Sequence, residues 1–79
     1  MPVIRDDFKN WIVLAIRSKG GSASLIEVAK YVWENYKSDL QRSGDMFFKW
    51  QYEVRWAATA LRKEGKLMPA DHTGIWRLK

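Results

Sequence analysis

The stretch Arg55–Lys79, RWAATALRKEGKLMPADHTGIWRLK, carries the clearest structural pattern in this 79-residue chain. It predicts the end of a helix, a glycine stop at Gly65, a short strand, a turn over residues 71–74 and a second strand. In the last strand Trp76 and Leu78 fall on one side, with the period of a half-buried strand. A basic helix followed by a small β-hairpin is therefore expected at this end of the chain.

The helix that leads into this stretch is predicted from about Lys49 to Glu64. Trp50, Val54 and Leu61 recur at helical spacing and form its apolar side. Its other side is polar and basic. The residues on that side are Tyr52, Arg55, Thr59, Arg62 and Lys66, with Gln51 and Lys63 at its edges.

Two more helices and a short strand are predicted before it. Residues 5–19 carry one apolar stripe, and Gly20 and Gly21 stop that helix. Residues 22–24 are expected to form a single short strand. Ser24 precedes Glu27 by three residues, the spacing of a capping box, so a second helix is predicted from Leu25 to about Tyr36.

The connection from Lys37 to about Phe48 is the least regular part of the sequence. It contains several turn-forming residues and then the apolar run Met46-Phe47-Phe48. The run is expected to pack as a loop or as an extra helical turn. A connection this long between two helices would either carry function or cover the core.

The predicted order is helix, strand, helix, helix, strand, strand. This order indicates an α+β fold that is mostly α: a winged helix-turn-helix with three helices and a small β-hairpin wing, in one domain over residues 1–79. The chain is 47% apolar with five tryptophans, which suits a small core without crosslinks. Because cysteine is absent, disulfides and thiolate metal sites are excluded.

The net charge of +5 is unevenly distributed. Residues 1–40 hold six Lys/Arg and five Asp/Glu, whereas residues 41–79 hold eight Lys/Arg and four Asp/Glu. The basic excess therefore lies in the half that contains the basic helix, where it would attract a polyanion. No run is apolar enough to span a membrane and no signal pattern is present, so a cytoplasmic location is expected, nucleoid-associated if the source is bacterial.

Several of these features, in this order, resemble the N-terminal winged-helix domain of Mrr-type restriction endonucleases. They are GGSASLIEV at residues 20–28, Trp56-Ala57, Leu61-Arg62-Lys63, Gly65-x-Leu67 and Gly74-x-Trp76-x-Leu78. The resemblance implies a module that contacts DNA beside a nuclease domain. Because this sequence ends at Lys79, without room for a nuclease fold, cleavage is not carried over. The chain is expected to be a small transcriptional regulator or a stand-alone, restriction-related target-recognition module.

The expected partner is double-stranded DNA, with the helix over residues 49–64 entering the major groove. Arg55 is the best candidate for a base contact and Gln51 the next. The remaining candidate DNA-binding residues are Lys49, Tyr52, Thr59, Arg62, Lys63, Lys66, Ser24, Thr73 and Arg77. Ser24 is expected chiefly to cap its helix, and Thr73 and His72 at the wing tip to reach at most a phosphate.

Other functions fit the sequence less well. It has no carboxylate pair with a neighbouring base, no glycine-rich phosphate loop and no Ser–His pair, so an enzyme, a small-molecule substrate or a cofactor is not expected. His72 is the only histidine, which argues against a metal site. The alternative is a protein-interaction module on the same scaffold, anchored by Tyr31, Tyr52 or Phe47. One small module would also need a homodimer or a partner protein for useful DNA specificity.

Overall fold

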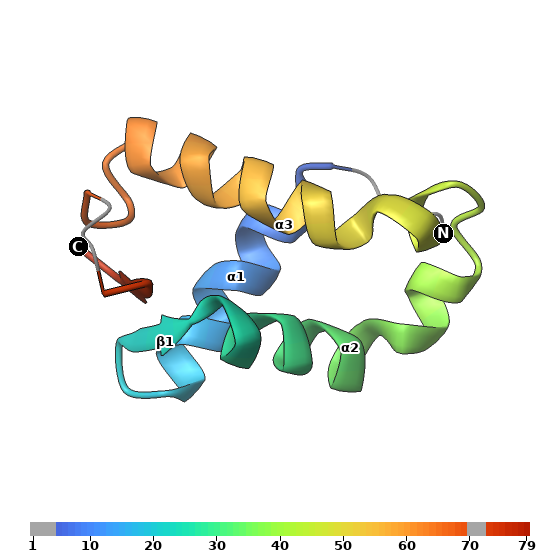
Figure 1. Ribbon diagram of the computed structural model, residues 1–79, viewed down its shortest axis with the longest axis horizontal. Helices are drawn as coiled ribbons and strands as arrows, with labels where there is room; N and C mark the ends of the chain where they lie inside the picture. Colours follow the sequence, from blue (N-terminus) through green and yellow to red (C-terminus); the bar gives the residue numbers. More distant parts are fainter. Residues whose placement is uncertain (1–4, 70–72) are drawn as a thin grey trace.

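The computed structural model describes residues 5–69 and 73–79. The elements in chain order are α1 (Asp7–Ser18), β1 (Ser22–Ser24), α2 (Leu25–Gln41), α3 (Met46–Lys63) and β2 (Ile75–Arg77). Figure 1 shows α2 and α3 running in opposite directions, with α1 packed against both and the strands at one end. The predicted α+β class, mostly α, is confirmed.

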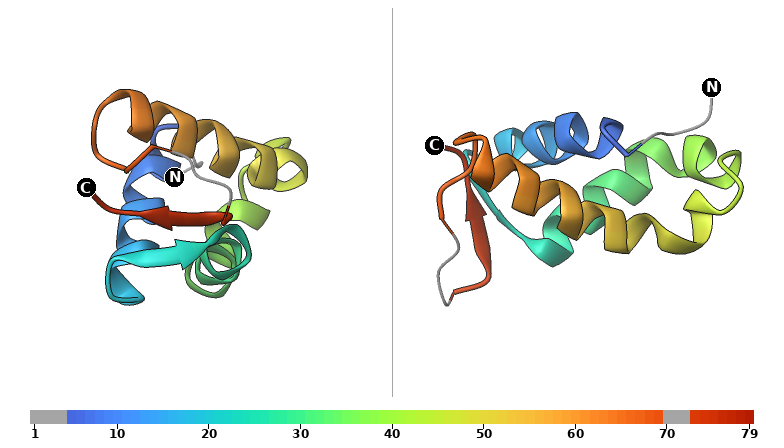
Figure 2. Two further views of the ribbon diagram at one scale, coloured as in Figure 1. Left: turned by 60° about the vertical axis from the view of Figure 1, so that its left-hand side comes forward. Right: turned by 90° about the horizontal axis from the view of Figure 1, so that it is seen from above.

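The small sheet pairs the strand between α1 and α2 with the strand near the C-terminus. β1 and β2 are antiparallel, with Ala23 opposite Trp76 (Figure 2). On the other edge of β2, the Met68 backbone N–H donates to the Arg77 carbonyl at 2.8 Å, and Leu67 forms an isolated bridge with Leu78. The strand predicted at Leu67 is thus reduced to a bridge. Pro69 follows it and has no N–H to continue the pairing.

The turn that was predicted between these two segments is described only in part. Thr73 and Gly74 belong to the described residues, whereas Asp71 and His72 lie outside them. At the other end of the hairpin, Gly65 has φ 79°, and the Lys66 N–H donates to the Leu61 carbonyl at 2.9 Å. This is the glycine-terminated helix end that the sequence predicted.

The second helix is longer than predicted. α2 continues to Gln41, with a kink at Tyr36 (φ −127°, ψ 15°), where the sequence placed its end. At the kink the Tyr36 ring stacks on Trp11 of α1, with ring centres 3.9 Å apart. Beyond it Leu40 is completely buried. Because α3 also begins early, at Met46, the long connection predicted over residues 37–48 shrinks to residues 42–45.

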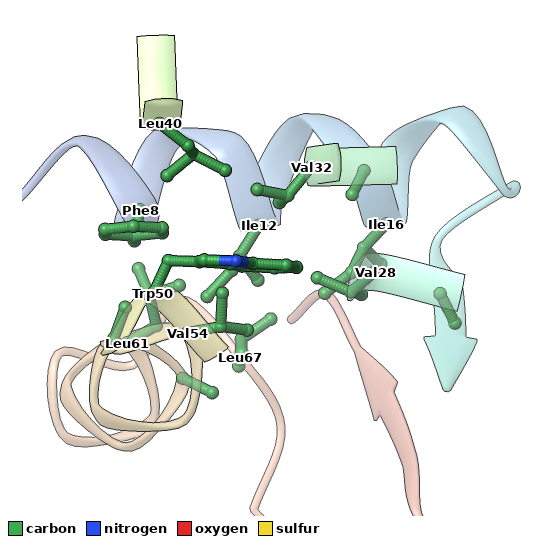
Figure 3. Packing of buried hydrophobic residues seen from close by; sticks show 14 residues of the cluster. Phe8, Ile12, Ile16, Val28, Val32, Leu40, Trp50, Val54, Leu61 and Leu67 are labelled. Atoms are coloured by element: carbon green, nitrogen blue, oxygen red, sulfur yellow. The ribbon is translucent and has the colours of Figure 1, made fainter. Parts of the chain in front are cut away.

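The core lies where the three helices meet (Figure 3). Phe8, Ile12 and Ile16 line the buried side of α1 and are fully buried. Trp50 of α3 reaches into the middle of this cluster and is 8% exposed. The other four tryptophans are half-buried. Trp50 is therefore a core residue, as its place on the apolar side of the predicted helix indicated.

The start of α2 has the predicted capping box. The Ser24 hydroxyl accepts from the Glu27 N–H at 3.1 Å, and the Glu27 carboxylate accepts from the Ser24 N–H at 3.0 Å. The backbone hydrogen bond lowers the pKa of the Glu27 carboxyl. Because this pKa is lower in the folded state, the contribution to stability is present at neutral pH and is lost as the pH falls through the lowered value.

Candidate nucleic-acid interface

The predicted contact residues of the third helix share one solvent-facing side of α3. With 3.6 residues per turn, Gln51, Tyr52, Arg55, Thr59, Arg62 and Lys63 fall within about one third of the helix circumference. All of them are exposed except Arg62, which is half-buried. The core residues Trp50, Val54 and Leu61 lie on the opposite side. We call this set of six residues the outer face of α3.

Two acidic residues of this helix and its C-terminal cap, Glu53 and Glu64, are bound by cations on its other side. Glu53 is 2% exposed and accepts two hydrogen bonds from Arg5, at 2.6 and 3.0 Å. Glu64, the C-cap residue, accepts from Lys9 of α1 at 2.5 Å. These bonds raise the pKa of the Arg5 guanidinium and the Lys9 ammonium, and the Lys9 bond lowers the pKa of the Glu64 carboxyl.

The outer face of α3 is left with a positive charge as a result. Within the described ranges 5–69 and 73–79, no carboxylate forms an ion pair with Arg55, Arg62 or Lys63. The Arg62 guanidinium of α3 lies 5.6 Å from the centre of the Trp76 ring of β2. This cation–π contact places the Arg62 charge where α3 meets β2. An uncompensated cationic face of this kind attracts a polyanion.

Other predicted contact residues are engaged in local bonds. The Thr59 hydroxyl donates to the Arg55 carbonyl at 3.2 Å, and the Thr73 hydroxyl accepts from the Ile75 N–H at 3.2 Å. Lys66 is exposed, but its ammonium lies 3.6 Å from the Glu64 carboxylate, which partly neutralises it. Ser24 is half-buried in its capping box, as expected.

The two remaining candidates, Lys49 and Arg77, do not belong to the outer face of α3. Lys49 is exposed in the first turn of α3. Arg77 is exposed on β2, opposite Ser22 of β1. The structure therefore brings most of the predicted residues to one side of the molecule, but it leaves Lys66 and Ser24 the least available for a ligand.

A groove between α2 and α3 was not apparent in the sequence. Its volume is about 480 Å³. The residues that line it are Leu25, Ile26, Ala29, Lys30 and Trp33 from α2 and Phe47, Trp50, Gln51, Val54 and Arg55 from α3. Three large apolar side chains on these two helices are strongly exposed: Ile26 (67%), Phe48 (85%) and Tyr52 (68%). Of the aromatics proposed as interaction anchors, Tyr31 and Phe47 are instead half-buried.

Comparison with protein families, curated proteins and solved structures found no match to this chain. In the part of the chain that the structure describes, no helix is both long and apolar enough to cross a membrane. The same residues contain no cluster of three or more His, Cys, Asp or Glu side chains that could hold a metal ion.

The Arg5–Glu53 pair supports a stability test. Arg5→Ala is expected to lower the melting temperature more than Lys9→Ala, because it leaves the buried Glu53 carboxylate without a partner. Glu64, the partner of Lys9, has a side chain that is 37% exposed and can bind water. The double variant Arg5→Ala/Glu53→Met should recover part of the loss, since methionine needs no partner. Thermal denaturation followed by circular dichroism measures all three, and an equal effect of both single variants would contradict this role of Arg5.

Proposed function

We propose that this protein is a winged-helix protein that binds double-stranded DNA through the outer face of α3. The observation that carries the proposal is the segregation of charge around this helix. The carboxylates of Glu53 and of the C-cap residue Glu64 are held on the α1 side by Arg5 and Lys9, while Arg55 and Lys63 project into solvent. A duplex presents one negative charge per ~1.7 Å of its axis and is the polyanion that a helix can enter.

The arrangement of strands supports the same proposal. β1 pairs with β2, and the segment after α3 hydrogen-bonds to the other edge of β2. This order, with one strand before the helix pair and a hairpin after it, is the one expected of a winged helix. Arg77 on β2 would then meet the phosphates beside the groove that α3 occupies.

The length of α3 divides the roles of its residues. At 1.5 Å per residue, Lys49 and Lys63 are about 21 Å apart along the axis, whereas the major groove is ~12 Å wide. Lys49 and Lys63 would therefore reach the two phosphate backbones. Arg55, in the middle, would reach a base edge, where its guanidinium can bind guanine with two hydrogen bonds. We propose a regulatory or target-recognition role for such a module.

Binding to duplex DNA is tested first with a random sequence at low and moderate salt. About five phosphate contacts give a slope of log K against log salt of roughly −4.5. In two-dimensional NMR, the amide shifts between Gln51 and Lys66 should change most. If no shift moves at low salt, or if changes occur everywhere except on α3, the proposal is wrong.

Two alanine variants separate base contacts from phosphate contacts. Arg55→Ala is expected to weaken binding to a selected site by about 1–3 kcal/mol, and binding to random duplex by less. Lys63→Ala should weaken both by a similar factor and reduce the salt slope by about one. The selected site comes from a randomised-duplex selection on the purified protein. Equal losses on both DNAs for both variants would rule out base recognition by Arg55.

A further inference from the structure

The groove between α2 and α3 has an apolar floor. The indole rings of Trp33 and Trp50 stack nearly parallel, with centres 5.9 Å apart, and Ala29 and Val54 complete the floor. α2 and α3 contact each other less extensively than α3 contacts α1, so this side of the helix pair is incompletely covered. Grooves of ~300–1,000 Å³ lined by apolar and aromatic side chains are the usual shape of binding sites.

The charges at the groove are of one sign. Lys30 lies on the α2 wall and Arg55 on the α3 wall, and no lining residue is acidic. The Lys37 ammonium lies 5.2 Å from the centre of the Trp33 ring and adds a third cation beside the floor. Two carboxylates of α2 are near in sequence, Glu27, which interacts electrostatically with Lys30, and Glu34, but neither lines the groove. An occupant must therefore combine apolar side chains for the floor with negative charge for the walls.

The need for both apolar side chains and negative charge distinguishes between the possible occupants of the groove. A second copy of this chain would bring a net charge of +5 against the cationic walls. A duplex has no apolar side chains and would leave the apolar floor unfilled. A helix with an apolar stripe and flanking carboxylates satisfies both, as in the recognition of amphipathic helices by hydrophobic grooves.

We propose that the groove between α2 and α3 binds an acidic amphipathic helix of a partner protein. Apolar side chains of that helix lie against Trp33 and Ile26, and its carboxylates pair with Lys30 and Arg55. Arg55 also belongs to the outer face of α3, so bound partner and bound DNA exclude each other. The peptide site does not depend on the DNA-binding proposal, because Lys30 and Ala29 lie outside the outer face of α3.

The test uses a capped, fluorescein-labelled synthetic peptide with Leu and Phe at i, i+3, i+4 and i+7 and Glu at the flanking positions. Two control peptides are used: a scramble of the same composition without an apolar face, and a version with Lys in place of Glu. In fluorescence anisotropy the acidic peptide is expected to bind with a saturable, micromolar Kd, and both controls at least about tenfold more weakly. The indole N–H shifts of Trp33 and Trp50 should change on binding.

Variants of the protein locate the site and separate the two proposals. Lys30→Glu reverses one wall charge and Ala29→Leu fills the floor, and each should weaken the acidic peptide about tenfold or more. Both should bind duplex DNA within about threefold of wild type. Lys63→Glu should weaken the binding of duplex DNA and leave the affinity for the acidic peptide unchanged. Unchanged circular dichroism spectra show that each variant is folded. Equal binding of acidic and scrambled peptides, no binding at all, or unchanged affinity in both groove variants overturns the proposal.

Discussion

Phe8→Ala is expected to destabilise the protein by about 3–5 kcal/mol. The Phe8 side chain is completely buried in the core and makes an edge contact with Trp11, with ring centres 5.1 Å apart. Its removal takes away the favourable transfer of the ring from water and leaves a cavity that the three helices cannot fully close. A domain of this length has a total stability of about 4–12 kcal/mol, so the variant should be largely unfolded at the lower end of that range.

The chain offers a matched control for this prediction. Phe48→Ala makes the same chemical change at a side chain that is 85% exposed and touches Phe47 at its edge. Its cost should stay below about 1 kcal/mol. Urea denaturation followed by circular dichroism gives both free energies of unfolding. Comparable losses in the two variants would show that Phe8 is not in the core of the folded protein.

Arg55→Glu is expected to weaken binding to duplex DNA about 10- to 100-fold. The substitution removes a proposed base contact worth about 1–3 kcal/mol and places a carboxylate in the middle of the outer face of α3. The slope of log K against log salt should also become less steep by about one to two. Fluorescence anisotropy with a labelled duplex at several salt concentrations measures both quantities.

Arg42→Glu is the control for this reversal. Arg42 is exposed at the end of α2, in the link to α3, at the opposite end of the helices from the sheet (Figure 1). Arg42→Glu changes the net charge by the same amount as Arg55→Glu, so any effect of overall charge is equal in the two variants. Binding should stay within about threefold of wild type. If Arg42→Glu weakens binding as much as Arg55→Glu, attraction is unspecific and the outer face of α3 is not the interface.

The predictable parts of the fold were those with local causes. The capping box of Ser24 and Glu27 and the glycine stop at Gly65 depend on backbone bonds within a few residues, and the structure has both. The missed parts depended on distant contacts. Ser38, with the turn-forming residues 43–45, suggests a loop, yet α2 continues past Ser38, and Leu40 is buried in the core cluster. Turn-forming propensities are weak compared with the burial of a leucine.

The candidate site also has parts that local sequence patterns predict and parts that depend on contacts between distant residues. Helical spacing placed Arg55, Thr59 and Lys63 on one side of a helix, and this side is the exposed one. The groove between α2 and α3 was invisible, because it depends on the distance and angle between two helices. Trp33 and Trp50 each fit an apolar stripe in the sequence, and only their mutual stacking shows that they form one floor.

Periodicity along the chain determined that a basic helix and then a half-buried strand would lie at the C-terminal end, because side-chain direction in a helix or strand repeats with a fixed period. Tertiary structure alone decided which of its charges remain available. Glu53 and Glu64 lie on or beside the same helix as Arg55, and their partners Arg5 and Lys9 are 48 and 55 residues away. Ion pairs form between groups that folding brings together in space, so Glu53 and Glu64 are neutralised only once Arg5 and Lys9 have packed against α3.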